Sequence, residues 1–310
     1  MKPVVCQHIE MHYIQGKKNV QALRDINFEV EQGELFGLIG PDGAGKTSLF
    51  RILTTLMLPT SGTALVNGLD TNRDFKKIRQ IVGYMPGRFS LYQDLSVKEN
   101  LQFFASLFHT KIESNYDQIR DIYEQLKPFE RRRAGKLSGG MKQKLALCCA
   151  LVHKPEVLFL DEPTTGVDPV SRKEFWQMLK KLQTEGISIV VSTPYMDEAS
   201  MCDRIALIQQ GQFLKIASPS DISDAYDKRL YAAASQHSFD LLTLLRTIPE
   251  VHQSFSFGDE VHFSLTGNHE NPAELLLAPI REAGIEDVQI REIKPGIEDV
   301  FMDLLEKQTV

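Results

Sequence analysis

Hydrophobic and polar positions alternate with different periods along the first two thirds of the chain. Residues 26–30 alternate apolar and polar side chains, whereas residues 35–39 are continuously apolar. The first pattern predicts a half-buried strand and the second a strand buried on both faces, joined by a turn at Gln32-Gly33. The apolar stretches 157–160 and 187–192 predict further buried parallel strands.

Helical spacing of apolar residues fills the stretches between these strands. Ser96 followed by Glu99 forms a capping-box pattern that opens one of the helices. The predicted helices cover residues 48–56, 96–109, 115–126, 139–152 and 171–183. Three of them form an α-helical insert at about residues 88–155. Two more strands, at 204–209 and 212–217, turn at Gln210-Gly211.

The pattern changes beyond about residue 220, where shorter strands and helices alternate. We expect strands at 231–235, 254–257, 261–265 and 288–292, and helices at 239–246, 272–283 and 297–307. The sequence therefore predicts two domains: residues 1–220, and a small α+β domain of residues 221–310. We expect the second domain to have a ferredoxin-like arrangement and an accessory or regulatory role.

Composition limits the functions that the chain can have. Its net charge of −6 argues against a broad nucleic-acid interface, and the run Arg131-Arg132-Arg133 is interpreted as a solvated turn. The four cysteines have no metal-site spacing, and Cys148 and Cys149 lie in an apolar run typical of buried small residues. No apolar run has the roughly 20 residues of a membrane helix, and no signal peptide is expected. Membrane contact is therefore expected only through a partner.

A glycine-rich loop follows the apolar strand 35–39 directly and precedes the helix 48–56. This context is the one that a phosphate-binding loop requires, because backbone N–H groups and the helix N-terminus favour anions. We expect Lys46 to contact the β- and γ-phosphates of ATP and Thr47 to ligate Mg²⁺. The expected nucleotide-binding residues here are Gly40, Pro41, Asp42, Gly43, Ala44, Gly45, Lys46, Thr47 and Ser48.

A second helix start with small residues occurs at Ser138-Gly139-Gly140, after Leu137. It also permits close approach of a phosphate. One reason for two such starts in one chain is that the second serves ATP held by another chain.

With this motif the chain resembles the nucleotide-binding subunits of ABC transporters, whose signature is Leu-Ser-Gly-Gly. Ser138 lies 23 residues before Asp161, as in that family. The segments 164–172 and 295–301 are similar to those of the bacterial multidrug and antibiotic-efflux branch. The resemblance implies an α/β P-loop NTPase core, with a mixed sheet, helices on both faces, N-terminal antiparallel strands and the helical insert.

The resemblance also implies roles for single residues. Asp161 would hold Mg²⁺ through water, and Glu162 would polarise the attacking water as general base. Asp168 would lie in the loop that crosses the dimer interface, and Tyr13 matches the aromatic residue that stacks on adenine. The segment 88–92 would lie near the groove that receives the transmembrane partner.

Two positions depart from the family pattern. Gly87 follows residues 83–86 where the family has a Gln, and Pro194 follows Thr193 where it has the His that contacts the γ-phosphate. Neither glycine nor proline offers a side-chain hydrogen bond. Arg88 and Tyr195 are each one residue away from these positions. Because side chains alternate in direction along extended segments, we do not expect Arg88 or Tyr195 to take over the roles of the missing Gln and His.

The leading hypothesis is an ATP-binding subunit of an ABC-type exporter, cytoplasmic and peripheral on the inner face of the cell membrane. It would bind Mg²⁺-ATP and dimerise through ATP. Its own site would hydrolyse weakly, while its signature completes the site of a different, competent ATP-binding subunit beside a transmembrane permease. Two alternatives remain: a non-hydrolytic ATP-dependent regulatory module, and a soluble ABC-type factor not tied to transport. A single ATP-binding half and the acidic balance argue against the latter.

Overall fold

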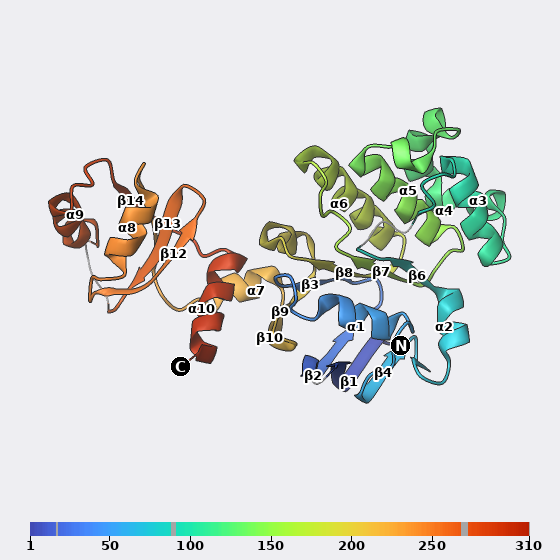
Figure 1. Cartoon of the computed structure of the whole chain (residues 1–310), viewed down its shortest axis with the longest axis horizontal. Helices are drawn as coiled ribbons and strands as arrows, with labels where there is room; N and C mark the ends of the chain where they lie inside the picture. Colours follow the sequence, from blue (N-terminus) through green and yellow to red (C-terminus); the bar gives the residue numbers. More distant parts are fainter. Residues whose placement is uncertain (17, 88–90, 268–271, 310) are drawn as a thin grey trace. The chain divides into compact units, whose positions relative to one another are not determined.

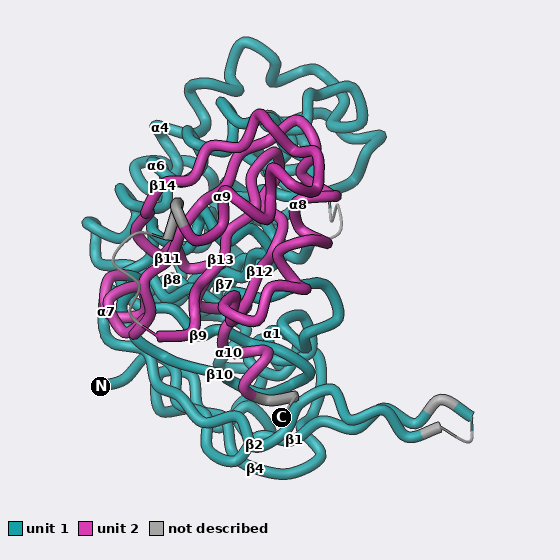
Figure 2. The backbone as a smooth tube through the Cα atoms, turned by 90° about the vertical axis from the view of Figure 1, so that its left-hand side faces the viewer, with its two compact units in different colours: residues 1–219 teal, residues 220–310 magenta. Residues whose placement is uncertain are grey.

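The computed structural model describes residues 1–16, 18–87, 91–267 and 272–309 of the chain. It divides into two compact units, residues 1–219 and 220–310, which Figure 2 distinguishes by colour. Each unit has a hydrophobic core of its own.

The central sheet of the first unit carries the elements that matter for function. Its strand order is β10-β9-β3-β8-β7-β6, and all neighbours are parallel except β10 and β9. The bounds are β3 Leu35–Ile39, β6 Val82–Met85, β7 Val157–Asp161, β8 Ser188–Thr193, β9 Arg204–Gln209 and β10 Gln212–Ala217. Every residue of β3, β7 and β8 is buried, which explains the apolar runs at 35–39, 157–160 and 189–191.

A smaller antiparallel sheet packs beside the central one. It comprises β1 Val4–Gln15, β2 Lys18–Val30, β4 Ser61–Val66 and β5 Leu69–Asp70, in the order β2-β1-β4-β5. Helix α1 (Lys46–Leu53) lies between the two sheets, and both contribute to one core around Phe36, Phe50 and Phe159. Figure 1 shows this layer on one side of the central sheet and the helices α5 (Gly139–Leu151) and α6 (Pro169–Thr184) on the other.

The insert is helical, as predicted. Between β6 and β7 lie α3 (Val97–Leu107), α4 (Tyr116–Leu126) and α5, with the short 3-10 helices η1 (Ile112–Asn115), η2 (Lys127–Phe129) and η3 (Ala134–Lys136). The predicted capping box of α3 is confirmed, since Ser96 and Glu99 exchange both hydrogen bonds. Cys148 and Cys149 are buried, and the three arginines at 131–133 are exposed.

The second unit is an α+β sandwich. Its sheet has the order β12-β13-β11-β14, with all neighbours antiparallel, which is the ferredoxin-like arrangement. The strands are β11 Leu230–Ala234, β12 Val251–Phe257, β13 Glu260–Leu265 and β14 Gln289–Ile293. The helices are α7 Pro219–Asp224, which begins at the unit boundary, α8 Ser238–Leu245, α9 Pro272–Glu282 and α10 Ile297–Thr309.

The predicted fold class is confirmed, with corrections of detail. The strands β2 and β3 follow one another across Gln32-Gly33 but do not pair, because β2 bonds to β1 and β3 to β8 and β9. The predicted helix at 48–56 begins at Lys46 and ends at Leu53. Local sequence patterns did not predict β1, β4, β5 or β6, nor α2 (Phe75–Ile81) and α7.

Candidate nucleotide-binding site

The carboxyl ends of four adjacent parallel strands meet at one edge of the central sheet. The next residues along the chain are Gly40 after β3, Pro194 after β8, Glu162 after β7 and Pro86 with Gly87 after β6. The backbone N–H of Gly40 donates to the carbonyl of Thr193 at 3.3 Å, which joins the first two segments. Ligands of open α/β sheets bind at such an edge.

The glycine loop after β3 is tightly enclosed by other backbone segments. A Cβ atom on Gly40 would lie 2.2 Å from the carbonyl oxygen of Ile208, and one on Gly45 would lie 2.6 Å from that of Ala22. Gly45 also has a left-handed backbone with φ of 108° just before α1. Only glycine fits at these two positions, and the loop leads directly into the N-terminus of α1, an end of a helix that favours anions.

Lys46 is buried inside this loop. Its Nζ donates to the carbonyl oxygens of Gly40 at 2.7 Å and Pro41 at 3.0 Å, and lies 3.1 Å from Oε1 of Glu162. A buried ammonium requires such oxygen partners. Phosphate oxygens are acceptors of the same kind, and the residues around Lys46 therefore fit a nucleotide phosphate.

The two acidic residues at the end of β7, Asp161 and Glu162, have different surroundings. Asp161 is buried, and its Oδ1 accepts a hydrogen bond of 2.7 Å from Oγ of Ser192. Glu162 is half-buried with φ of 50°, and its N–H lies 3.1 Å from both the carbonyl and the Oγ of Ser192. A left-handed backbone at a residue with a Cβ costs energy and is concentrated at functional sites. Ser192, which the sequence analysis did not identify as a site residue, positions both.

Gly87 lies against the aspartate. A Cβ atom at this position would lie 3.0 Å from the carbonyl oxygen and 3.7 Å from Oδ2 of Asp161. A longer side chain here would therefore reach the region where Asp161 is expected to hold Mg²⁺. Tyr84 lies nearby on β6, where burial and the Asp161 carboxylate raise its pKa to about 12, so its phenol stays neutral.

The segment around Pro194 has no histidine, and its neighbours have other partners. Tyr195 donates its backbone N–H to Oγ1 of Thr193 at 3.0 Å, and its ring lies 4.2 Å from the guanidinium carbon of Arg172. The Tyr195 side chain is thus engaged with α6. Arg88, the other residue weighed as a substitute, lies outside the described residues.

The signature residues lie at the start of α5. Ser138 caps this helix, with its Oγ accepting from the N–H of Met141 at 3.3 Å. A Cβ atom on Gly140 would lie 2.6 Å from Oγ of Ser171, so the first turn of α5 packs directly on α6. A Cβ atom on Gly139 would lie 3.5 Å from the carbonyl oxygen of Gly166, an ordinary van der Waals contact.

Asp168 caps α6 beside the signature. Its Oδ1 accepts from the N–H of Ser171 at 3.0 Å, and this hydrogen bond lowers the pKa of the Asp168 carboxyl. The predicted residues therefore form two clusters: the glycine loop with Asp161 and Glu162, and the adjoining starts of α5 and α6 with Ser138, Gly139, Gly140 and Asp168.

Tyr13 lies at the edge of the first cluster. It is half-buried on β1, and its hydroxyl lies 3.1 Å from Oγ of Ser48 in the first turn of α1. The same hydroxyl lies 3.1 Å from Sδ of Met57. The Tyr13 side chain therefore lies beside the first turn of α1, and its contact with adenine stays a prediction.

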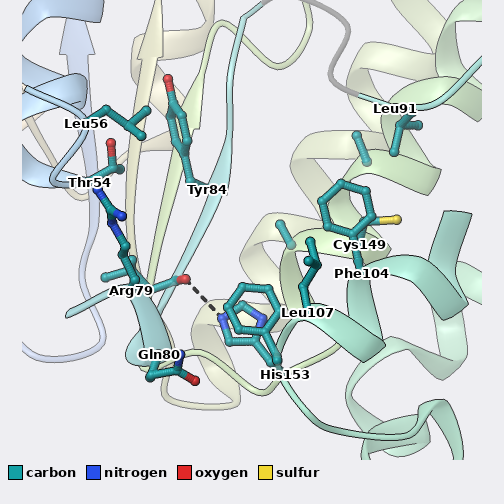
Figure 3. Close-up of a pocket in the computed structure, with 14 residues that line it drawn as sticks. Thr54, Leu56, Arg79, Gln80, Tyr84, Leu91, Phe104, Leu107, Cys149 and His153 are labelled. Carbon is teal, nitrogen blue, oxygen red and sulfur yellow. Dashed lines mark hydrogen bonds between the residues drawn. The ribbon is translucent and has the colours of Figure 1, made fainter. Parts of the chain in front are cut away.

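A mainly apolar groove of about 500 Å³ opens between β6 and the helices α3 and α5 (Figure 3). Its lining includes Tyr84, Leu91, Phe104 and Leu107. His153 also lines it, stacked on Phe108 and donating from Nε2 to the carbonyl of Val82 at 3.0 Å. Burial lowers the pKa of His153, which keeps the imidazole neutral. Of the predicted interface segment 88–92, residues 88–90 lie outside the described residues.

Comparison with known proteins identifies the family. The family model of ABC transporters matches residues 23–165. The linearmycin resistance ATP-binding protein LnrL of Bacillus subtilis is 30% identical over 295 residues, which cover 93% of this chain and 94% of that protein. The chain belongs to the ABC transporter ATP-binding family.

Other relatives agree with this assignment. A protein of Escherichia coli named as the probable multidrug ABC transporter ATP-binding protein YbhF is 40% identical over 289 residues, which are 92% of this chain. The chain spans about half of that relative, 49% of its length. The dimeric ATP-binding cassette MJ0796, solved with ADP and Pi, aligns with a TM-score of 0.64 at 25% identity, over 69% of this chain and 98% of that one.

Members of this family bind ATP, normally with Mg²⁺. The glycine loop and Lys46 fit its phosphates, while Thr47 and the buried Asp161 offer the oxygen atoms that Mg²⁺ prefers. Among the residues that the structure describes, no helix is long and apolar enough to cross a bilayer.

Proposed function

We propose that this chain is an ATP-binding subunit of an exporter of the drug-efflux type, which binds Mg²⁺-ATP but hydrolyses it weakly at its own loop site. The observation that carries the proposal is the composition of one sheet edge. The phosphate-binding loop, Lys46, Asp161 and Glu162 are all in place, whereas Gly87 and Pro194 offer no polar side chain to the γ-phosphate or the attacking water.

Each bound group would have a defined place. The loop N–H groups and Lys46 would bind the phosphates, and Thr47 and Asp161 would hold Mg²⁺, Asp161 through water. Tyr13 would stack on adenine, and Ser48 would complete the first turn of α1. Glu162 would act as general base once it separates from Lys46, because its carboxylate must face the attacking water.

The signature cluster supports a role toward another cassette. Ser138 and Gly139 are exposed at the start of α5, and Asp168 lies beside them on an exposed turn. In the related cassette MJ0796 the solved form is dimeric. We therefore propose that Ser138, Gly139 and Gly140 complete the ATP site of a second, competent cassette, with Asp168 at the interface.

The groove in Figure 3 supports a permease as the second partner. Its lining is mainly apolar, and Leu56 and Leu107 at its border are 58% and 53% exposed. An apolar helical segment of a transmembrane subunit would cover these side chains. Such a contact would put the chain at the inner face of the cell membrane, peripheral to the bilayer. The second unit, residues 220–310, would be accessory to the cassette.

The test uses the assembly that the chain forms with its co-purifying cassette and permease. Glu162→Gln in this chain should reduce ATP hydrolysis by less than about twofold, since the competent site lies elsewhere. Ser138→Arg should reduce it on the order of a hundredfold or more, because a bulky cation fills the phosphate position of the partner's site. Glu34→Gln, at the opposite edge of the sheet, is the control for general damage.

A large loss from Glu162→Gln would contradict the proposed asymmetry. Hydrolysis by the purified chain alone at rates of about 1–10³ s⁻¹, the usual range for enzymes, would contradict it as well. Tight ATP binding without any effect of a partner cassette would favour the non-hydrolytic regulatory module.

A further inference from the structure

Glu198 is a buried carboxylate just outside the nucleotide site. It belongs to η4 (Met196–Met201), the 3-10 helix that follows β8, and it is only 4% exposed. A buried carboxylate is costly unless hydrogen bonds satisfy it. Its partners therefore indicate which parts of the chain must stay together.

Three separate segments donate to this one side chain. Oε1 of Glu198 accepts from Oγ1 of Thr164 at 2.8 Å and from Nε of Arg172 at 3.1 Å. Oε2 accepts from Oγ1 of Thr193 at 2.5 Å. The carboxylate thus joins the segment after β7, the helix α6 and the end of β8.

Two of these segments belong to the chain's own ATP site. Thr164 is the second residue after Glu162, and Thr193 directly precedes Pro194. Since Oγ1 of Thr193 also accepts the backbone N–H of Tyr195, Pro194 is held between two bonded residues. A movement of the Thr164 segment or of the Thr193 segment would therefore change the hydrogen bonds of Glu198.

The third segment leads to the signature. Arg172 lies in the first turns of α6, where its N–H donates to the carbonyl of Asp168 at 2.9 Å. The neighbouring Ser171 is the residue that packs against Gly140 at the start of α5. A second ion pair, from Arg172 to Asp197 at 3.2 Å, reinforces the tie between α6 and η4.

We infer that Glu198 is a positioning residue that couples occupancy of this chain's own ATP site to the first turn of its signature helix. The inference rests on the proposed function, because it assumes that the loop site binds ATP and that the signature is offered to another cassette. The Pro194 ring offers no hydrogen bond to a phosphate. The segment around Pro194 is instead connected with α6 through the hydrogen bonds of Thr193 and Arg172 to Glu198.

The experiment measures ATP affinity and amide hydrogen exchange on the same full-length samples. Fluorescent ATP gives the affinity, and exchange in a peptide covering residues 139–145 reports the signature turn, with and without Mg²⁺-ATP. Light scattering fixes a concentration at which the chain is monomeric. In the unaltered chain, ATP should slow exchange in this peptide by about fivefold or more.

Glu198→Gln keeps the side-chain volume but replaces one acceptor oxygen with an NH₂ donor, so it cannot accept from all three segments. We expect it to bind ATP within about threefold of the unaltered affinity, below the usual range of allosteric coupling, and to lose the slowing in residues 139–145. Thr193→Val removes the hydroxyl and should act likewise, whereas Thr193→Ser keeps the hydroxyl and should restore the response.

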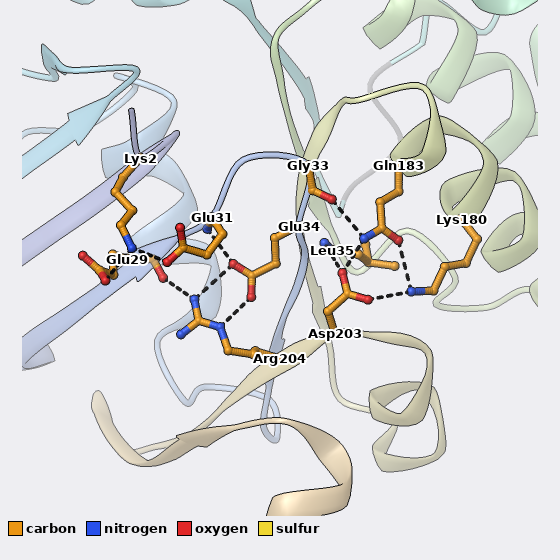
Figure 4. Close-up of polar contacts among 10 residues, drawn as sticks. All are labelled: Lys2, Glu29, Glu31, Gly33, Glu34, Leu35, Lys180, Gln183, Asp203 and Arg204. Atoms are coloured by element: carbon orange, nitrogen blue, oxygen red, sulfur yellow. Dashed lines mark hydrogen bonds and ion pairs between the residues drawn. The ribbon is translucent and has the colours of Figure 1, made fainter.

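Glu34→Gln is the matched control, shown at the opposite edge of the sheet in Figure 4. Glu34 is 6% exposed and accepts from Nε of Arg204 at 2.6 Å, so it is a buried carboxylate–arginine pair of the same kind. It should retain both ATP binding and the exchange response.

The outcomes separate the two proposals. Failure of the unaltered chain to bind ATP would refute the proposed function. ATP binding with an unchanged response in Glu198→Gln or Thr193→Val would refute the coupling alone, and so would an absent response in the unaltered chain. If Glu198→Gln does not fold, the pair Thr193→Val and Thr193→Ser decides.

Discussion

The two edges of the central sheet both bury ionic groups, but they satisfy them differently. At the amino-end edge, Glu34 accepts two hydrogen bonds from Arg204 and one from the N–H of Glu31, while Asp203 pairs with Lys180 (Figure 4). At the carboxyl-end edge, Lys46 is held by carbonyl oxygens of its own loop and by Glu162, whose backbone is left-handed.

This difference indicates what each edge does. Side-chain partners from separate elements hold the amino-end edge in one arrangement and stabilise the fold. The partners of Lys46 at the carboxyl-end edge are ones that an incoming phosphate would displace. Substitutions at the first edge should therefore change stability, and those at the second should change nucleotide handling.

The largest expected effect comes from restoring the two missing side chains. Gly87→Gln together with Pro194→His should raise ATP turnover by at least about 10²-fold, because the loss of even one preorganised donor to a transition state typically costs about 10²–10³ in rate. Steady-state phosphate release measures it. A Cβ at position 87 is tightly placed, 3.0 Å from the Asp161 carbonyl, so Gly87→Gln alone should give less. Unchanged turnover in the double variant would show that the site is limited elsewhere.

Lys46→Ala tests the carboxyl-end edge directly. We expect ATP affinity to fall about a hundredfold, since a buried charged donor to phosphate is lost. Titration with fluorescent ATP gives the affinity, and circular dichroism checks the fold. An affinity that stays within a few-fold would mean that the loop backbone alone holds the phosphates.

Arg204→Met is the counterpart at the amino-end edge. It leaves Glu34 buried without its guanidinium, which should lower the free energy of unfolding by about 1–3 kcal/mol. Urea denaturation measures this loss, while ATP affinity should remain unchanged. A variant of normal stability but weaker ATP binding would remove the distinction between the two edges.

Glu162→Gln should strengthen ATP binding. The carboxylate competes with phosphate for Lys46 at 3.1 Å, and its loss should raise ATP affinity about fivefold, the equivalent of roughly 1 kcal/mol. The same fluorescence titration detects this change. Weaker binding would indicate that Glu162 orients Lys46 for the nucleotide.

The smallest effect concerns pH. Because the pKa of Asp168 is lowered in the folded chain, its capping of α6 adds stability above the ordinary aspartate pKa. This contribution should disappear as the pH falls through the lowered pKa. Melting temperatures of the unaltered chain and Asp168→Asn should therefore differ at neutral pH and converge in acid. A constant difference at all pH values would argue against a charged cap.

Local patterns predicted much of the fold. The buried strands β7 and β8, the helices α3 to α6 and the capping box at Ser96 all have strong local signals. The strands β1 and β4 were not located, because their partners lie far away in the sequence and β1 is irregular, with several register shifts against β2. The pairing of β3 with β8 rather than with β2 likewise depends on contacts between segments that are far apart in the sequence.

The sequence by itself determined the chemistry that is available. The glycine spacing before Lys46, the acidic pair at the end of β7 and the missing polar groups at Gly87 and Pro194 are all local features, since each depends on residues adjacent in the chain. Only the tertiary structure decided which side chains meet, because packing brings together segments that no local pattern connects. The hydrogen bond from Ser192 to Asp161 and the three donors around Glu198 arise in this way.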